Sequence, residues 1–175
     1  MAVIDELLVA NRRFSGAQPQ HQLPMPPARK LAALACMGAR LDPAQVLGLA
    51  KGDAHVIRNP GGRARDSVRS LVVSQRLPGT TANAVVRHPD CETLTFTNPT
   101  IHARIQDDRS ADASDMDLLP FGNVEVIVRE DLALLRYSTL ITPDTEIRGF
   151  IYDVKTGGLS EVDTPVSTLT AHITR

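Results

Sequence analysis

Two cysteines and one histidine have the residue types and spacing of a metal site. Cys36 ends the apolar stretch LAALAC, and His88 and Cys91 stand three residues apart in the stretch RHPDC. Thiolate and imidazole ligands together favour zinc over magnesium or calcium. Three protein ligands with a fourth position open are the pattern of catalytic zinc, because structural zinc usually has four protein ligands. The three residues therefore predict a catalytic zinc site.

Structural roles for the same residues stay open at this point. A free cysteine is among the most buried residue types, so either thiol could belong to a core. A single histidine at a strand end is often a hydrogen-bonded structural residue. The coincidence of all three residues at strand ends favours the metal site. The other histidines are not candidates, because they lie in a predicted strand, in predicted loops or in the tail: His55, His21, His102 and His172.

Predicted strands and helices would bring these three residues together. A short apolar run at 31–36 predicts a buried parallel strand, and two further strands are predicted at 54–59 and 83–88. A helix is predicted after Asp42 and Pro43, carrying Val46, Leu47 and Leu49. A second helix is predicted over 66–77, with Asp66 and Ser67 as N-capping residues.

Alternation of strands and helices predicts a parallel sheet with right-handed crossovers. Ligands of such sheets bind at the carboxyl ends of the strands. Cys36 and His88 stand at those ends, so the predicted fold positions the predicted ligands.

The segments before and after these three strands also have recognisable patterns. Residues 2–14 predict an amphipathic helix, and residues 15–29 predict an extended arm rich in Pro, Gln and Gly. Residues 98–120 are polar and Asp-rich, and predict an irregular surface excursion. The last two predictions are a helix from 124 to 135 capped by Asn123, and a hairpin over 147–162 that turns at 155–158. Residues 163–175 predict a loose tail. The whole chain, residues 1–175, is predicted to form a single domain.

Composition excludes several classes of partner. The chain has 175 residues, 42% of them hydrophobic, which suits one globular domain. Its net charge of −1 and its 3% of aromatic residues argue against nucleic-acid binding. No apolar run has the length that crosses a bilayer, and the N-terminus does not resemble a signal peptide. We therefore expect a cytoplasmic protein that binds neither nucleic acid nor membrane.

The stretches ACMGARLD, AHVIRNPGG and VVRHPDCETLTF resemble the β-class carbonic anhydrases. That family typically reads C-x-D-x-R, then R-N-A-G, then H-x-x-C-G. The resemblance continues through RGFIYDVKTGGLSEV and so covers residues 1–162. It implies a mainly parallel α/β sheet flanked by helices, with an antiparallel edge strand. It also implies a homodimer or homotetramer, in which the N-terminal helix packs on a neighbouring subunit.

By the same resemblance, Cys36, His88 and Cys91 are the ligands of a Zn²⁺ ion. Arg40 matches the arginine of the family's aspartate–arginine pair, and we take it as the candidate catalytic residue. The aspartate of that pair is replaced by Gly38, which can neither orient a nucleophile nor hold the arginine.

Three further departures accompany Gly38. Pro60 stands where the family usually has alanine, Glu92 replaces the glycine after the second cysteine, and Arg87 precedes the ligand histidine. Arg58, together with Arg40, could attract bicarbonate or another small anion, or could belong to a structural ion pair.

The resemblance implies a zinc-dependent lyase that hydrates CO₂ to bicarbonate. Loss of a positioned acid–base group costs about 10²- to 10⁴-fold in rate, so Gly38 predicts reduced activity. Two alternatives remain open at this point. One is a hydrolase of carbonyl sulfide or carbon disulfide, and the other is a non-catalytic zinc-binding relative.

Overall fold

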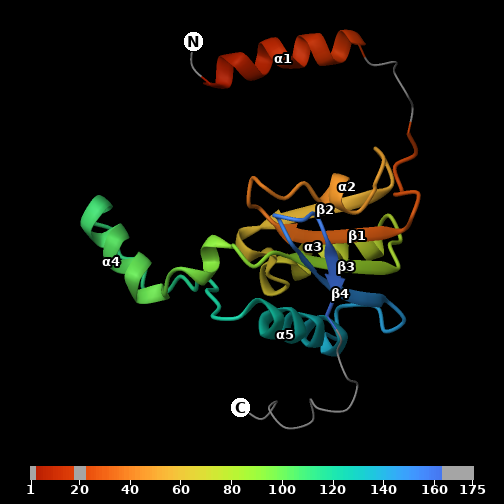
Figure 1. Ribbon diagram of the computed structural model, residues 1–175. Helices are drawn as coiled ribbons and strands as arrows, with labels where there is room; N and C mark the ends of the chain where they lie inside the picture. The colour runs from red at the N-terminus through yellow and green to blue at the C-terminus, as the bar shows by residue number, and fades with distance from the viewer. Residues whose placement is uncertain (1–2, 18–22, 163–175) are drawn as a thin grey trace.

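The computed structural model describes residues 3–17 and 23–162, and a five-stranded sheet forms its centre (Figure 1). The strands are β1 (Leu31–Cys36), β2 (Ala54–Asn59), β3 (Ala82–Arg87), β4 (Glu146–Tyr152) and β5 (Leu159–Glu161). Their order across the sheet is β2-β1-β3-β4-β5. All neighbours are parallel except β4 and β5, which are antiparallel. The predicted α/β fold with an antiparallel edge strand is therefore confirmed.

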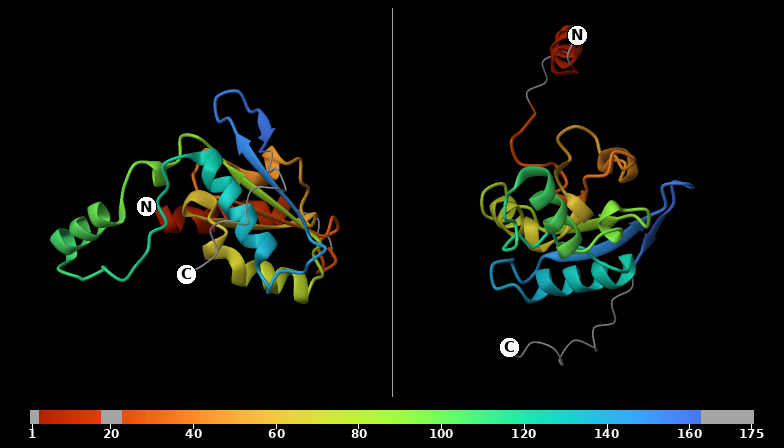
Figure 2. Two further views of the ribbon diagram at one scale, coloured as in Figure 1. Left: turned by 90° about the horizontal axis from the view of Figure 1, so that it is seen from below. Right: turned by 90° about the vertical axis from the view of Figure 1, so that its left-hand side faces the viewer.

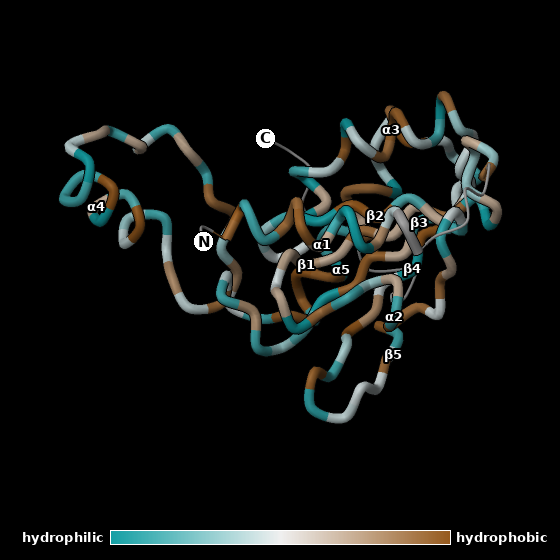
Figure 3. The backbone as a smooth tube through the Cα atoms, turned by 90° about the horizontal axis from the view of Figure 1, so that it is seen from above, coloured by the Kyte–Doolittle hydropathy of each residue, from teal (hydrophilic) through white to brown (hydrophobic). Residues whose placement is uncertain are grey.

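Two helices cover one face of this sheet (Figure 2). They are α3 (Val68–Arg76) and α5 (Val124–Tyr137). Their inward side chains meet those of the central strands in one buried apolar cluster, which includes Leu34, Val85, Leu71, Val128 and Leu132. Figure 3 shows the matching pattern, with hydrophobic residues along β1 and β3. The predicted strands 31–36 and 83–88 thus form the centre of the sheet as β1 and β3, whereas β2 lies at its edge with Asn59 as its buried residue.

A close approach between α5 and β4 requires a glycine. A Cβ atom at Gly149 would lie 2.5 Å from Val128 Cγ1 and 2.8 Å from Leu132 Cδ1. Asn123 caps this helix, accepting hydrogen bonds from the backbone N–H groups of Glu125 and Val126. The predicted cap is confirmed, and the position of α5 on the sheet is fixed by contact rather than by the cap.

The helix in the crossover from β1 to β2 is shorter than the sequence pattern indicates. Asp42 caps α2 (Pro43–Val46) through its side chain, as predicted. The helix nevertheless ends at Val46, so the expectation that it extends to Leu49 is wrong. Gly48 has a φ of +59°, a conformation that breaks the helical path.

The segment 98–120 is not irregular throughout, which corrects the sequence prediction. Residues Asn98–Arg109 form helix α4, which Thr97 caps and which carries Pro99 in its first turn. None of its residues is buried, and Figure 1 shows it projecting away from the sheet. A helix that is polar on all sides has no apolar stripe, so hydrophobic periodicity could not reveal it. The stretch Thr97-Asn98-Pro99 is a helix start signal, and it was the evidence in the sequence for this helix.

The first helix, α1, spans Val3–Ala17 and is longer than predicted. The arm predicted from residue 15 therefore starts later, and residues 18–22 and the predicted tail at 163–175 lie outside the described residues. Figure 1 shows α1 standing apart from the sheet. Among the described residues, no helix combines the length and the apolar character needed to cross a membrane.

Candidate metal centre

Cys36, His88 and Cys91 meet at one edge of the sheet. Strands β1 and β3 are parallel neighbours, so their carboxyl ends lie side by side. Cys36 is the last residue of β1, His88 follows β3, and a turn returns the chain to Cys91. One sulfur or nitrogen atom from each residue lies within 4.8 Å of the others, and all three residues are buried. The structure therefore brings together the three residues that the sequence singled out.

The chemistry of this group fits a metal ion. His88 is 3% exposed, and neither of its ring nitrogens has a hydrogen-bond partner among the described residues. A buried imidazole without a partner is costly unless a ligand compensates it. Both cysteines are free thiols, with their sulfurs 3.4 Å apart. Two sulfurs and one imidazole nitrogen, with no fourth protein ligand in the described part of the chain, match the donor set of catalytic zinc.

The two thiols differ in their surroundings. A hydrogen bond joins the sulfurs of Cys36 and Cys91, and this bond together with burial raises the pKa of Cys36. The same hydrogen bond lowers the pKa of Cys91, and the Thr93 hydroxyl at 2.8 Å from its sulfur adds to the effect. Metal binding requires the thiolate form of both cysteines.

Arg58 holds the turn that follows Cys36. Its guanidinium donates hydrogen bonds to the backbone oxygens of Cys36 at 3.1 Å, Gly38 at 2.8 Å and Leu41 at 2.7 Å. The sequence left open whether Arg58 attracts an anion or has a structural role, and these contacts are structural. Their acceptors are backbone carbonyl groups rather than the carboxylate of an ion pair. It fixes the backbone on which Cys36 and Gly38 are carried.

Gly38 lies directly beside the ligand atoms. A Cβ atom there would lie 3.1 Å from His88 Nε2 and 3.7 Å from Cys36 Sγ. The backbone of Gly38 does not adopt a positive φ, in contrast to Gly62, whose φ is +63°. Gly62 also packs against β1, since a Cβ atom there would lie 2.9 Å from Cys36 N. Gly62 is therefore required by the backbone, whereas the backbone at residue 38 accepts a side chain, whose Cβ would crowd His88 Nε2.

A cavity of about 410 Å³ opens onto the three candidate ligands. Its wall also includes Gly38 and the sequence-predicted Arg40, Pro60 and Glu92. Arg40 donates a hydrogen bond to the backbone oxygen of Asp90 at 2.7 Å, and its guanidinium lies 3.7 Å from the Asp90 carboxylate. Asp90 is a wall residue that the sequence analysis missed, although it lies between His88 and Cys91.

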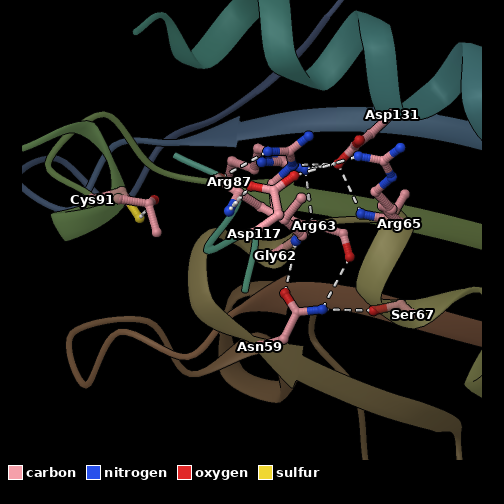
Figure 4. A network of polar contacts seen from close by, with 12 residues as sticks. Asn59, Gly62, Arg63, Arg65, Ser67, Arg87, Cys91, Asp117 and Asp131 are labelled. Atoms are coloured by element: carbon pink, nitrogen blue, oxygen red, sulfur yellow. Dashed lines mark hydrogen bonds and ion pairs between the residues drawn. The ribbon is translucent and has the colours of Figure 1, made fainter. Parts of the chain in front are cut away.

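A second group of charged residues lies behind this wall, and Figure 4 shows it from close by. Arg87 is 1% exposed and pairs with the equally buried Asp131 of α5. Asp131 also accepts hydrogen bonds from Arg63 Nε at 3.3 Å and from the backbone N–H of Ala64 at 2.8 Å. Burial lowers the pKa of Arg87 to about 10, so the side chain is still charged at neutral pH.

Sequence reasoning missed the network around Arg87, even though Arg87 was noted as a departure from the family pattern. The available signal was Asp131, an acidic residue within the apolar side of the predicted helix over 124–135. A buried carboxylate requires a charged or hydrogen-bonding partner, but the sequence does not say which one.

The remaining polar residues named from the sequence have structural contacts. His55 lies in β2 as predicted, with Nδ1 2.7 Å from Ser74 Oγ. His102 lies in α4 rather than in a loop, and its Nε2 is 2.8 Å from the backbone oxygen of Met116. Ser67 stands at the N-cap position of α3, as predicted, but its side chain makes no capping hydrogen bond, and its hydroxyl accepts one from Asn59 instead. His21 and His172 lie outside the described residues.

Known proteins share this fold and much of this sequence. Beta-carbonic anhydrase 1 of Mycobacterium tuberculosis (strain ATCC 25618 / H37Rv) is 39% identical over 163 residues, which cover 93% of this chain and 99% of the relative. The crystal structure of a carbonic anhydrase from Streptococcus mutans superposes with a TM-score of 0.89 at 44% identity, covering 93% of this chain and 99% of that one. A carbon disulfide hydrolase of Acidithiobacillus thiooxidans is 29% identical over 161 residues, covering 80% of each chain. No family model matches the chain.

Proposed function

This chain belongs to the β-carbonic anhydrase family, and we propose that it hydrates carbon dioxide at a zinc ion held by Cys36, His88 and Cys91. The observation that carries the proposal is the convergence of these three buried side chains on one cavity. Zinc supplies a Lewis acid that lowers the pKa of a coordinated water to about 7.

The side chains around the metal centre divide the remaining tasks. Several apolar residues line the cavity, which suits a small uncharged substrate such as CO₂: Met37, Ala39, Pro60 and Phe96. Arg40 lies at the wall with Asp90 and is the cationic side chain among the lining residues. Arg40 therefore has the charge to attract the bicarbonate product.

Hydration releases one proton, and residue 38 offers no group to accept or orient it. We therefore propose that the rate is below that of a relative that carries an acid–base group at this position. A positioned group of this kind contributes about 10²- to 10⁴-fold. The Gly38→Asp variant should recover part of that factor, provided that His88 shifts by a few tenths of an ångström, since the new Cβ would start 3.1 Å from its Nε2.

A second candidate function is hydrolysis of carbon disulfide or carbonyl sulfide. The observation that favours it is the 29% identity to a carbon disulfide hydrolase. A non-catalytic zinc protein is the third possibility, because Gly38 removes a functional group from the cavity.

One set of assays separates these three functions. Stopped-flow CO₂ hydration and sulfide release from carbon disulfide and carbonyl sulfide are measured on wild type and Gly38→Asp, each with its zinc content determined. We expect CO₂ hydration in both proteins, faster in Gly38→Asp. Sulfide release without hydration would favour the second function, and zinc without either activity the third.

Zinc analysis tests the ligands directly. We expect one zinc per chain in the wild type and a large loss in Cys91→Ser and in His88→Ala. Arg65→Gln is the matched control, because Arg65 is exposed, pairs with Asp117 and does not line this cavity. Full zinc occupancy in both ligand variants would overturn the assignment.

We also propose that the chain forms a homodimer or a homotetramer. Its support is α1, which carries exposed apolar side chains at Ile4, Leu7 and Leu8, with exposed fractions of 69%, 58% and 60%. An unpaired apolar helix face of this kind is typical of a contact with another subunit. Light scattering at micromolar concentration should report an assembly, which Leu7→Asp weakens and the control Glu6→Gln does not. A monomeric wild type would contradict the proposal.

A further inference from the structure

Arg87 lies on the opposite side of β3 from His88, although the two residues are consecutive. Arg87, the last residue of β3, pairs with Asp131 of α5, whereas His88, the next residue, lines the cavity. Arg87 is 1% exposed and does not line the cavity. Such a residue can influence the metal site only through the groups that it contacts.

The first of these contacts leads to Cys36. Arg87 donates a hydrogen bond to the backbone oxygen of Gly62 at 2.9 Å. Gly62 packs on the backbone of β1, where a Cβ atom would lie 2.9 Å from Cys36 N and 3.0 Å from Ala35 C. There is no room between these segments, so a displacement of Gly62 would displace Cys36 as well.

The second contact leads to Cys91. The guanidinium of Arg87 lies over the ring of Phe121, 5.4 Å from its centroid. The backbone N–H of Phe121 donates to the backbone oxygen of Thr93 at 3.3 Å, and the Thr93 hydroxyl lies 2.8 Å from Cys91 Sγ. The same hydroxyl oxygen and the Phe121 ring both crowd Gly61, within 3 Å of the position that a Cβ atom would take.

We propose that Arg87, anchored by Asp131, is a positioning residue that sets the separation of Cys36 and Cys91 and thereby the affinity of the chain for zinc. One guanidinium links α5 to both turns that support the thiols (Figure 4). The inference rests on the proposed metal centre and assigns a role to residues that do not touch it. Partners behind metal ligands typically change metal affinity by about 10- to 100-fold when they are removed.

The chain offers variants that keep the network testable. Arg87→Met retains the length of the side chain and removes the charge. Two of the Arg87 nitrogens, Nε and Nη1, have no hydrogen-bond partner among the described residues, so their removal loses no bond. Arg87→Met combined with Asp131→Asn removes the buried carboxylate charge as well, in case the single variant does not fold. Arg87→Lys keeps a charge opposite Asp131 but cannot make the same set of contacts.

The experiment measures zinc affinity by competition with a chromophoric chelator, and the spectrum of the cobalt(II)-substituted protein, for each variant that folds by circular dichroism. We expect the affinity of Arg87→Met and of the double variant to fall by about 10- to 100-fold, with an intermediate loss in Arg87→Lys. The cobalt(II) bands, including those from thiolate to metal, should shift in the same order. The control is again Arg65→Gln, which changes an exposed arginine of the neighbouring network.

Wild-type affinity and an unchanged cobalt(II) spectrum in the folded double variant would overturn the proposal. A wild type that binds zinc tightly but does not hydrate CO₂ would overturn the proposed function and leave this inference standing. A wild type that binds no zinc would overturn both, and the zinc analysis of the ligand variants identifies that case independently.

Discussion

The two faces of the metal-site wall differ in the partners of their buried side chains. The imidazole on one face has none, whereas on the other face a guanidinium pairs with a carboxylate, although Arg87 Nε and Nη1 have no hydrogen-bond partner among the described residues. On the cavity face, His88 has no hydrogen-bond partner among the described residues, and Gly38 lies close beside it. On the opposite face, Asp131 accepts from Arg87, from Arg63 and from a backbone N–H, and no solvent reaches it.

This difference separates a binding site from its support. Unpaired buried donors and acceptors beside a cavity indicate a ligand, because the free energy of burying them must be offset by something that binds. A dense buried ion network indicates structural coupling, because breaking it leaves an uncompensated charge. We therefore expect substitutions on the closed face, which carries Arg87 and Asp131, to lower the stability strongly. Substitutions on the cavity face should change the stability little.

The largest effect on stability should come from Asp131→Asn. Its removal leaves Arg63 and Arg87 without a counter-charge, and breaking a buried ion pair in this way costs about 3–5 kcal/mol. Urea unfolding of the metal-free protein measures the change. The neighbouring exposed Glu130→Gln serves as the control. A loss below about 1 kcal/mol would mean that the network does not couple α5 to the sheet.

Gly62→Ala should rank second. An alanine at a φ of +63° is strained by about 1–3 kcal/mol, and its Cβ atom would press on Cys36 N at 2.9 Å. Because the contact is with backbone, the strain cannot be relieved by a side-chain rotation. The same unfolding assay should show a loss of at least about 2 kcal/mol, and an unchanged midpoint would contradict the close packing of this turn on β1.

Gly38→Ala should have a smaller effect, of up to about 1 kcal/mol in either direction. The backbone tolerates the substitution, while the contact at 3.1 Å with His88 Nε2 is relieved by a small movement of the ring. Comparing the loss of stability in this variant with that in Gly62→Ala shows how tightly each side of Cys36 is packed. If both alanines destabilised the protein equally, the cavity side would be as tightly packed as the closed side.

Arg40→Gln should have the smallest effect on stability. Arg40 and Asp90 are both exposed, with side-chain exposed fractions of 59% and 46%, and an exposed ion pair contributes less than about 1 kcal/mol. Its effect should appear instead in the kinetics of CO₂ hydration. A destabilisation comparable to that of Asp131→Asn would show that Arg40 is part of the structural framework.

The sequence alone determined the main features of the sheet and the position of the candidate ligands. The apolar run at β1 predicted a buried strand, the stretches at β2 and β3 predicted two further strands, and side-chain caps at Asp42 and Asn123 predicted helix starts. These features depend on residues close to one another in the chain, so short-range patterns suffice to reveal them. The ligands followed because parallel strands end at the same edge of the sheet.

Only the tertiary structure decided which polar residues pair. Arg87 meets Asp131 across 44 positions of the chain, and Arg63 meets the same carboxylate across 68. The roles of Arg58 and Asp90 likewise depend on which backbone oxygens and side chains the fold brings within reach. A charged residue in a sequence can be satisfied by many partners, and only packing of the sheet against α5 selects one of them. Sequence therefore located the site, whereas long-range packing determined what holds it in place.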